Sequence, residues 1–279
     1  MKYGKTDRGI EVAQCHEFDL EQTLSCGQCF RWEKQDDQRF FLLFGGRSLT
    51  VWEDSQTKTV VFEEVSEEEF LTVWAAYFDL YTDYGAIRQT LSGCGPVMEE
   101  AAAFAPGIRI LRQDPWEALC TFIISQNNNI PRIKGIVSRL CKTFGEPVPG
   151  GFGFPEPSAL AGLSPEDLAP LRCGFRAAYL CSAARLVVDG TVDLERLRTL
   201  PLPDARAMLQ QIHGVGPKVA ECVLLYGLHR LECFPMDVWM KRVMKILFPG
   251  KDETFFGPYA GVAQQYLFHY SRLHPHLFD

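Results

Sequence analysis

The sequence predicts an α+β protein in which an antiparallel β-rich part over residues 1–105 is followed by an all-α part over residues 106–279. Short runs rich in β-branched and aromatic residues, broken by turn residues, fill the stretch between Val12 and Val65. After Pro106, nearly every segment has apolar residues at helical spacing. A chain of 279 residues, 47% of them apolar, can bury the core of two ordinary domains.

The β-rich part should form an antiparallel sheet with flanking helices. Its predicted strands lie within the runs EVAQCHEFDL, FFLLFGG, SLTVWED and KTVVFEEV. Ser66 and Glu69, three residues apart, form a capping box, which marks the start of a helix. Apolar residues then follow at helical spacing, at Phe70, Val73, Trp74 and Tyr77.

The later part carries repeated helix signals. In DPWEALCTFIIS, Asp114 is the expected N-cap and Pro115 the first helical residue. The segment PRIKGIVSRLCKTFG should end at Gly145, and SPEDLAPLR and DARAMLQQI have similar caps. The stretch GEPVPGGFGFPEP, rich in Gly and Pro, is expected to connect helices rather than separate domains.

Composition and charge limit the function classes. The formal net charge of −7 argues against a general polyanion binder. It divides into −10 over residues 1–105, with 9 Lys or Arg and 19 Asp or Glu, and +3 over residues 106–279, with 19 and 16, so a nucleic-acid surface should lie in the later part. No long apolar run and no signal peptide are present, so we expect an intracellular protein that does not enter a membrane.

Two of the ten cysteines, Cys26 and Cys29 in SCGQCFRW, have the spacing of a redox or metal motif. A zinc site needs about four ligands, and the chain has no second close cysteine pair. Most other cysteines stand in apolar surroundings such as EALCTFII and are expected to be small buried hydrophobes. A metal or redox protein is therefore the weaker interpretation.

The segment LQQIHGVGPKVAECVLLYGL predicts a helix-hairpin-helix at about residues 203–229. The first helix should end near Ile212, and Pro217 should start the second. The hairpin between them consists of Gly214, Val215 and Gly216. Glycines allow close backbone approach, and the amides of the second helix form a site for an anion such as a DNA phosphate. On the motif alone, a glycine-rich turn between two packed helices is an equally good interpretation.

Two residues near the hairpin suggest chemistry. Lys218 lies in the first turn of the second helix, where the helix dipole favours a neutral amine, so it is a candidate nucleophile. Nineteen residues later, Asp237 precedes an apolar helix and is, taken alone, most simply its N-cap. The expected apolar face of that helix consists of Trp239, Val243, Ile246 and Leu247.

Five stretches together resemble a known family. They are CGQCFRW, LRQDPWEALCTFIISQNNNIPRI, GVGPKVA, PMDVWM and GPYAGVAQQYLF, and they span about residues 20–270. The chain is similar to the 8-oxoguanine DNA glycosylases, which are helix-hairpin-helix base-excision enzymes with an N-terminal β-domain. The resemblance implies a bifunctional DNA N-glycosylase and apurinic/apyrimidinic-site lyase. Such an enzyme flips 8-oxoguanine out of duplex DNA, releases the base through a lysine Schiff base and nicks the strand by β-elimination.

By this resemblance, Lys218 attacks the sugar C1′ and Asp237 stabilises the positive charge that develops on the sugar. The iron–sulfur glycosylases carry a cysteine cluster after the aspartate, whereas the last cysteine here is Cys233. We therefore expect no iron–sulfur cluster, no zinc and no other cofactor. The expected partner is damaged double-stranded DNA with 8-oxoguanine opposite cytosine, bound by a monomer.

The resemblance also implies a pocket for the flipped base. Gly27 would offer its carbonyl to the N7 hydrogen, which 8-oxoguanine has and guanine lacks. Gln264 would read the Watson–Crick edge, while Cys222 and Phe268 would enclose the base. Taken alone, Cys222 and Phe268 are equally well explained by core packing.

Further residues are implied in contacts with the rest of the DNA. Asn127, Arg132 and Arg176 would recognise the cytosine opposite the lesion. Phe175 stands where the animal enzymes have tyrosine, so a wedge between bases would lack the hydroxyl. Trp239 replaces a histidine that contacts phosphate in those enzymes. A structural cation at the hairpin would be held by the carbonyls of Gln210, Ile212 and Val215.

Two other interpretations remain within DNA binding. One is a glycosylase of the same superfamily that removes another damaged base without a lysine nucleophile, against which Lys218 argues. The other is a non-enzymatic helix-hairpin-helix DNA-binding protein, which leaves Lys218 and Asp237 together unexplained.

Overall fold

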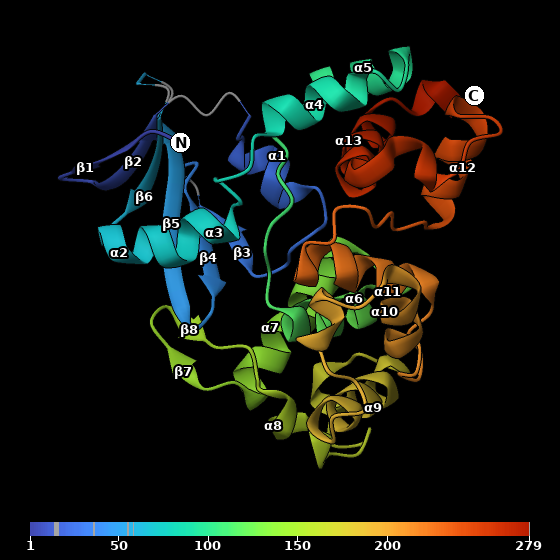
Figure 1. Cartoon of the computed structure of the whole chain (residues 1–279). Helices are drawn as coiled ribbons and strands as arrows, with labels where there is room; N and C mark the ends of the chain where they lie inside the picture. The colour runs from blue at the N-terminus through green and yellow to red at the C-terminus, as the bar shows by residue number, and fades with distance from the viewer. Residues whose placement is uncertain (14–16, 36, 55, 58, 279) are drawn as a thin grey trace.

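Six strands in the N-terminal part form one antiparallel sheet in the order β1-β2-β6-β5-β4-β3 (Figure 1). The computed structural model describes residues 1–13, 17–35, 37–54, 56–57 and 59–278. The strands are β1 (Tyr3–Thr6), β2 (Gly9–Ala13), β3 (Trp32–Lys34), β4 (Phe40–Phe44), β5 (Arg47–Asp54) and β6 (Thr59–Glu63). Gly45 and Gly46 make the β4–β5 turn at φ of 56° and 73°, the left-handed conformation that a two-residue hairpin requires. The predicted α+β class is confirmed.

All four predicted β-runs contain strand residues, and FFLLFGG, SLTVWED and KTVVFEEV each hold nearly a whole strand with buried apolar residues. In β5, for example, Leu49 and Val51 are buried and their neighbours are not. In the run EVAQCHEFDL, β2 ends at Ala13, and the strand prediction is wrong for residues 17–20. Residues 14–16 of that run lie outside the described part, and helix α1 (Leu20–Ser25) follows. Strands β1 and β3 were not predicted.

A helical segment after the sheet packs on its core. It consists of α2 (Glu67–Glu69), the π-helical turn η1 (Phe70–Trp74) and α3 (Ala75–Tyr77). The N-cap of the predicted capping box is confirmed, because Ser66 Oγ accepts a hydrogen bond from the Glu69 amide at 3.1 Å; the Glu69 carboxylate accepts one from the Trp74 indole N–H at 3.1 Å. Phe70 is fully buried and its ring lies 5.0 Å from that of Phe62 in β6.

Helices α4 (Tyr84–Ser92) and α5 (Pro96–Phe104) pack with the helical part rather than with the sheet. Their buried residues join the same hydrophobic cluster as the later helices, and Tyr270 of the last helix donates a hydrogen bond to Glu100 at 3.0 Å. The predicted division after residue 105 stays a prediction.

The helical part follows the expected order with two differences. Its helices are α6 (Pro115–Ser125), α7 (Ile130–Phe144), α8 (Pro157–Ala161), α9 (Arg176–Val188), α10 (Leu202–Leu209), α11 (Pro217–Cys222), the π-helical turn η4 (Val223–Gly227), α12 (Val238–Leu247) and α13 (Ala260–Leu273). Short 3₁₀ turns are η2 (Ala169–Leu171), η3 (Arg196–Arg198), η5 (Glu253–Tyr259) and η6 (Pro275–Phe278). SPEDLAPLR was wrongly predicted as a helix and forms turns and η2. Helix α10 begins before Asp204, with Pro201 as N-cap.

The caps of α6 and α7 are as predicted. Asp114 accepts a hydrogen bond from the Glu117 amide at 2.8 Å, and Gly145 is the C-cap of α7. Between α7 and α8, the Gly/Pro-rich stretch connects helices as expected and also forms a short hairpin of β7 (Pro147–Val148) and β8 (Gly151–Phe152).

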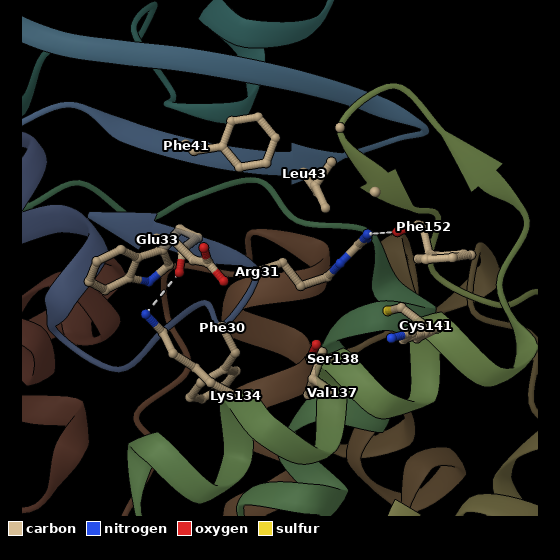
Figure 2. Close-up of a pocket in the computed structure, with 14 residues that line it drawn as sticks. Phe30, Arg31, Glu33, Phe41, Leu43, Lys134, Val137, Ser138, Cys141 and Phe152 are labelled. Carbon is tan, nitrogen blue, oxygen red and sulfur yellow. Dashed lines mark hydrogen bonds between the residues drawn. The ribbon is translucent and has the colours of Figure 1, made fainter. Parts of the chain in front are cut away.

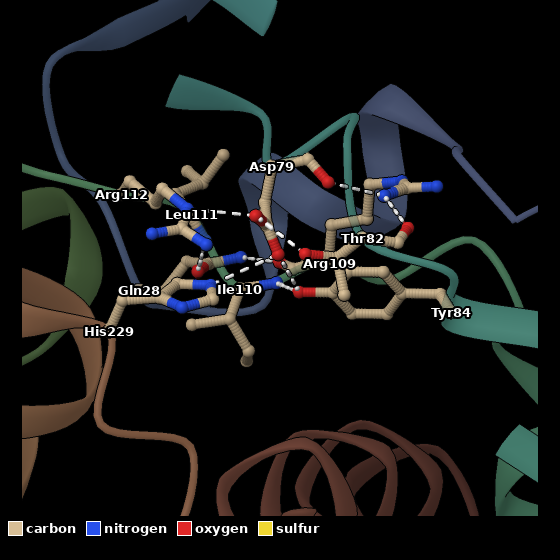
Figure 3. A network of polar contacts seen from close by, with 9 residues as sticks. All are labelled: Gln28, Asp79, Thr82, Tyr84, Arg109, Ile110, Leu111, Arg112 and His229. Atoms are coloured by element: carbon tan, nitrogen blue, oxygen red, sulfur yellow. Dashed lines mark hydrogen bonds and ion pairs between the residues drawn. The ribbon is translucent and has the colours of Figure 1, made fainter. Parts of the chain in front are cut away.

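A buried polar network joins the sheet part to the helical part (Figure 3). Asp79, directly after α3, is 1% exposed. Its carboxylate accepts hydrogen bonds from Arg112 at 2.8 Å and Tyr84 at 3.1 Å, and it lies 3.0 Å from Nε2 of His229, which follows η4. Arg109 donates to the Asp79 carbonyl at 2.7 Å. The network therefore fixes the end of the helix-hairpin-helix against the N-terminal part.

Two sequence-wide expectations concern cysteines and membranes. Of the nine cysteines in the described residues, eight are buried and Cys94 is half-buried, and all nine are free thiols. Within the described ranges, no helix has both the length and the apolar character required to span a membrane.

Candidate active site

The hairpin between α10 and α11 depends on Gly214. Its φ is +86°, and a Cβ atom there would lie 2.3 Å from the ring of Tyr179. The chain then turns back because the Val215 amide donates to the Ile212 carbonyl at 2.9 Å. Gly216 is the N-cap of α11, with Pro217 at its first position, so the predicted helix-hairpin-helix is present.

Lys218 and Cys222 lie one turn apart on α11. The Lys218 amine is half-buried and 5.3 Å from the ring centre of Phe122 in α6. Cys222 is 2% exposed. Burial raises the pKa of the Cys222 thiol, although the neighbouring Lys218 opposes the shift. The thiol is therefore a neutral wall beside the amine.

Asp237 begins α12, and its Oδ1 accepts a hydrogen bond from the Met240 amide at 2.7 Å. The predicted apolar face of α12 is partly wrong. Ile246 is 43% exposed, whereas Met240, Val243 and Met244 are buried. The helix is rotated from the expected face because its core contacts fall on the two methionines.

Glu221, which sequence reasoning missed, ties Asp237 to the helix of Lys218. Its side chain is 7% exposed, forms an ion pair with Arg206 at 2.5 Å and accepts a hydrogen bond from the Phe234 amide at 2.8 Å. The extended segment before Asp237 is thereby held against α11.

These residues surround one pocket of about 190 Å³. It is lined by Cys26, Gly27, Phe30, Phe122, Ser125, Asn128, Ile130, Ile133, Lys218, Cys222, Tyr226, Pro235, Asp237, Gln264, Gln265 and Phe268. Six of the predicted residues are among them, namely Gly27, Lys218, Cys222, Asp237, Gln264 and Phe268. The pocket thus joins the turn after α1 with α11, α13 and the start of α12.

The turn that carries Gly27 is fixed by amide side chains. Gly27 has φ of +85°, and the nearest atom to a Cβ placed there is Ile130 Cδ1 at 4.0 Å. Gln28 is fully buried; its side chain donates to the Arg109 carbonyl at 2.7 Å and accepts from the Leu111 amide at 2.9 Å. Gln113 donates to the Gln28 carbonyl at 2.7 Å. Sequence reasoning missed both glutamines.

Cys26 and Cys29 flank this turn as packing residues. Each is 4% exposed, and burial raises the pKa of both thiols, that of Cys26 to about 12. Thiols of this kind stay protonated, which is the opposite of what a reactive cysteine or metal ligand requires. Among the described residues, no group of three or more His, Cys, Asp and Glu side chains is placed to hold a metal ion.

The residues predicted to contact the opposite strand lie outside the pocket. Asn127 is exposed at φ of +47°, Arg132 is exposed, and Phe175 is 53% exposed. Arg176 differs from these exposed residues because it is 3% exposed and donates to the backbone carbonyls of Gln126 and Asn127. Burial, together with the charge of Arg132, lowers its pKa. The DNA-reading roles of these residues stay predictions.

Comparison with known proteins matches this architecture. Residues 12–119 match the 8-oxoguanine DNA glycosylase N-terminal domain, and residues 120–254 match the HhH-GPD superfamily of base excision DNA repair proteins. The N-glycosylase/DNA lyase of Saccharomyces cerevisiae is 32% identical over 258 residues, covering 82% of this chain and 68% of the yeast protein. The chain belongs to the 8-oxoguanine DNA glycosylase family.

Other family members agree over nearly the full chain. An N-glycosylase/DNA lyase of Arabidopsis thaliana is 29% identical and aligns with 90% of this chain and 77% of its own length. The Clostridium acetobutylicum 8-oxoguanine glycosylase/lyase, solved with double-stranded DNA containing cytosine opposite 8-oxoguanine, is 34% identical with a TM-score of 0.90 and covers 99% of both chains.

The side chain of Trp239 forms its hydrogen bond within the protein. Its indole N–H donates to Ser271 Oγ at 2.8 Å, and its ring lies 5.0 Å from that of Phe278. The indole N–H of Trp239 is therefore already hydrogen-bonded to a side chain of α13.

A second hollow of about 260 Å³ lies between strands β3 and β4, helix α7 and strand β8 (Figure 2). Across it, Lys134 donates to the Trp32 carbonyl at 2.9 Å and lies 3.3 Å from the centre of the Trp32 ring. Arg31 forms a buried ion pair with Glu117 at 3.0 Å. The Lys134 contacts hold α7 against the sheet, and the ion pair holds α6 there; the asparagine loop (Asn127, Asn128 and Asn129) connects these two helices.

Proposed function

We propose that this chain excises 8-oxoguanine from duplex DNA and then nicks the strand by β-elimination. The observation that carries the proposal is the convergence of an amine, a carboxylate and base-sized walls on one pocket, namely Lys218, Asp237, Cys222 and Phe268. A non-enzymatic DNA-binding protein has no need of that arrangement. The activity named for the yeast relative and the substrate named for the Clostridium acetobutylicum protein support the same reaction.

In the proposed reaction, Lys218 Nζ forms a bond to C1′ while the bond from C1′ to the base breaks and its electron pair leaves with the base. The attacking nitrogen then loses a proton, which neutralises the departing base, and cleavage of the C1′–O4′ bond with protonation of O4′ gives a Schiff base. Loss of a C2′ proton then expels the 3′ phosphate. Asp237, half-buried at the start of α12, stabilises the positive charge that develops on the sugar.

Base selection in the proposal rests on the remaining pocket groups. The Gly27 carbonyl accepts the N7 hydrogen of 8-oxoguanine, which guanine cannot offer because its N7 is an acceptor. Gln264 meets the Watson–Crick edge, and Cys222 and Phe268 enclose the base. Lesion and parent base therefore differ by one donor in the pocket.

DNA engagement is proposed to use the exposed groups around the pocket. Asn127 and Arg132 meet the opposite cytosine, and Phe175 fills the gap left by the flipped base. Arg176 assists by holding the carbonyls of the asparagine loop. The hairpin of Gly214, Val215 and Gly216 approaches a phosphate through its backbone.

No cofactor enters the proposed reaction, because a lysine amine serves as both nucleophile and electron sink. A cation held by the hairpin carbonyls of Gln210, Ile212 and Val215 would be structural, and oxygen donors of this kind suit a hard cation. We expect a monomer whose excision rate survives a chelator.

The test is the Lys218→Gln variant on duplexes that pair 8-oxoguanine with each of the four bases. Base release should fall at least about 1,000-fold, and borohydride should no longer trap a covalent complex, while DNA binding persists. Lys245→Gln, an exposed lysine on α12, is the matched control and should retain activity. Full base release by folded Lys218→Gln protein would disprove the mechanism.

A further inference from the structure

Tyr226 lies beneath the pocket, eight residues after Lys218, in the π-helical turn η4. It is 3% exposed, and its ring stacks on Phe122 with centres 5.1 Å apart and planes 19° apart. The stacking fixes the phenol, so its hydroxyl points at a defined place on α13. Neither the motifs nor the family resemblance assigned this residue a role.

The hydroxyl links two consecutive glutamines of α13. The Gln265 side-chain amide donates to Tyr226 Oη, and Oη donates to Gln264 Oε1 at 3.3 Å. Gln264 and Gln265 are 5% and 2% exposed. Because Oη already accepts a hydrogen bond from Gln265, its own proton is directed to Gln264. Burial raises the pKa of Tyr226 well above its ordinary value, so this proton is retained.

An amide group has one acceptor and one donor end, so this chain of hydrogen bonds defines which end of Gln264 faces the base. With Oε1 bound to Tyr226, the Nε2 donors remain for the ligand. A donor there suits a base with a carbonyl at the 6-position. It opposes a base with an amino group at that position, because two donors would then meet.

We propose that Tyr226 and Gln265 are positioning residues that orient the Gln264 amide and so make the pocket selective for 6-oxopurines over 6-aminopurines. The inference rests on the proposed function and adds to it the source of selectivity at the Watson–Crick edge. The inference predicts that 8-oxoguanine is preferred over 8-oxoadenine. The Gly27 carbonyl does not explain this preference, because both lesions have an N7 hydrogen that it can accept.

Tyr226 is also connected to the turn that carries Gly27. The Gln113 amide donates to the Tyr226 carbonyl at 3.1 Å, and the Gln113 side chain donates to the Gln28 carbonyl at 2.7 Å. Gln113 therefore fixes the position of Tyr226, which orients Gln264, relative to the turn that carries the Gly27 carbonyl.

The experiment compares Tyr226→Phe with Tyr266→Phe. The first removes the bridging hydroxyl and keeps the stacked ring. The second removes a hydroxyl that is buried on the same helix as Gln264 and has no hydrogen-bond partner among the described residues. Single-turnover excision is measured on duplexes with 8-oxoguanine or 8-oxoadenine opposite the same base. The ratio of the two rates should fall about tenfold in Tyr226→Phe and stay unchanged in Tyr266→Phe, since one oriented hydrogen bond is lost.

A double-variant cycle separates positioning from loss of fold. In a Gln264→Leu background, Tyr226→Phe should leave the ratio unchanged because the group it orients is gone. Gln265→Leu should lower the ratio as Tyr226→Phe does, and it carries the test if Tyr226→Phe does not fold. An unchanged ratio in folded Tyr226→Phe or Gln265→Leu protein overturns the inference. Failure of the unsubstituted protein to excise 8-oxoguanine instead overturns the proposed function.

Discussion

At the scale of single residues, Gly27 is glycine because of its backbone conformation. The protein leaves room for a Cβ there, since the nearest atom is 4.0 Å away, but φ of +85° is unfavourable for any side chain. The side chain would also occupy the pocket wall from which the carbonyl is proposed to reach the base. Backbone strain and loss of base contact can therefore be measured separately.

We expect Gly27→Val to lower kcat/KM for 8-oxoguanine by about 100-fold or more, because the polar contact that defines the lesion is lost. Gly190→Val is the matched control. Gly190 has a similar φ of +79° with no atom within 4 Å of a placed Cβ, but lies outside the pocket. Both variants should lose similar thermal stability, measured by melting temperature. Equal loss of excision in the two would show that strain alone explains the effect.

At the scale of elements, the two glycines of the hairpin, Gly214 and Gly216, are needed for different reasons. Gly214 cannot carry a Cβ because Tyr179 fills the space, whereas a Cβ at Gly216 meets nothing within 4 Å. The φ of Gly216, −92°, is accessible to any residue. The first glycine is thus required by the packing of the protein, whereas the second is available for the proposed phosphate contact.

Gly214→Ala should lower the free energy of unfolding by about 3 kcal/mol, through a strained backbone and an overlap with Tyr179. Gly216→Ala should fold normally and bind duplex DNA more weakly, because the added methyl group holds the backbone away from a phosphate. Denaturant unfolding and DNA titrations at one salt concentration give the two values. Normal stability of Gly214→Ala would contradict the role given to Tyr179.

Sequence reasoning succeeded for elements with local signals. Asp114, Ser66 and Asp237 were predicted as caps because a capping side chain binds amides only two or three residues away. SPEDLAPLR failed because Pro170 lacks the amide hydrogen that an α-helix needs there, so the buried Leu168 and Leu171 are carried by turns and η2 instead. Ile246 failed because the face of α12 that is buried depends on what packs against it.

Pocket residues were predictable where helical spacing or the family resemblance pointed to them. Lys218 and Cys222 share a helix face by spacing, and family resemblance supplied Gly27 and Gln264. Tyr226 was not predictable, because its partners come from α6 and α13, and only tertiary packing brings them together. Arg176 is the converse case: the resemblance implied that it recognises the opposite cytosine, whereas its side chain is buried by hydrogen bonds to the carbonyls of Gln126 and Asn127.

At the scale of the whole molecule, the Asp79 network controls how the two parts of the chain are joined. Burial alone would raise the pKa of Asp79, but hydrogen bonds and charge from His229 and Arg112 outweigh it, so the pKa lies below its ordinary value. A lowered folded-state pKa contributes stability above the unfolded-state value of about 3.9, and that stability is lost as pH falls through the folded-state pKa.

Asp79→Asn should therefore lower the free energy of unfolding by about 3–5 kcal/mol at pH 7, because cationic partners lose a buried carboxylate. The difference from the unsubstituted protein should shrink as the pH falls from the unfolded-state value of about 3.9 through the lower folded-state pKa, where that protein also loses the charge. Chemical unfolding across this pH range measures both quantities. Asp189→Asn, which alters an exposed carboxylate, is the control. A difference independent of pH would indicate that packing rather than charge is responsible.

The pocket walls come from both matched halves of the chain. Gly27 lies in the region that matches the N-terminal domain of the family, while Lys218 and Asp237 lie in the region shared with other base excision repair proteins. Under the proposed roles, the carbonyl that distinguishes the oxidised base from its parent and the residues that cleave the bond lie in different matched regions. A substitution at Gly27 can thus change which base is released and leave the cleaving residues in place.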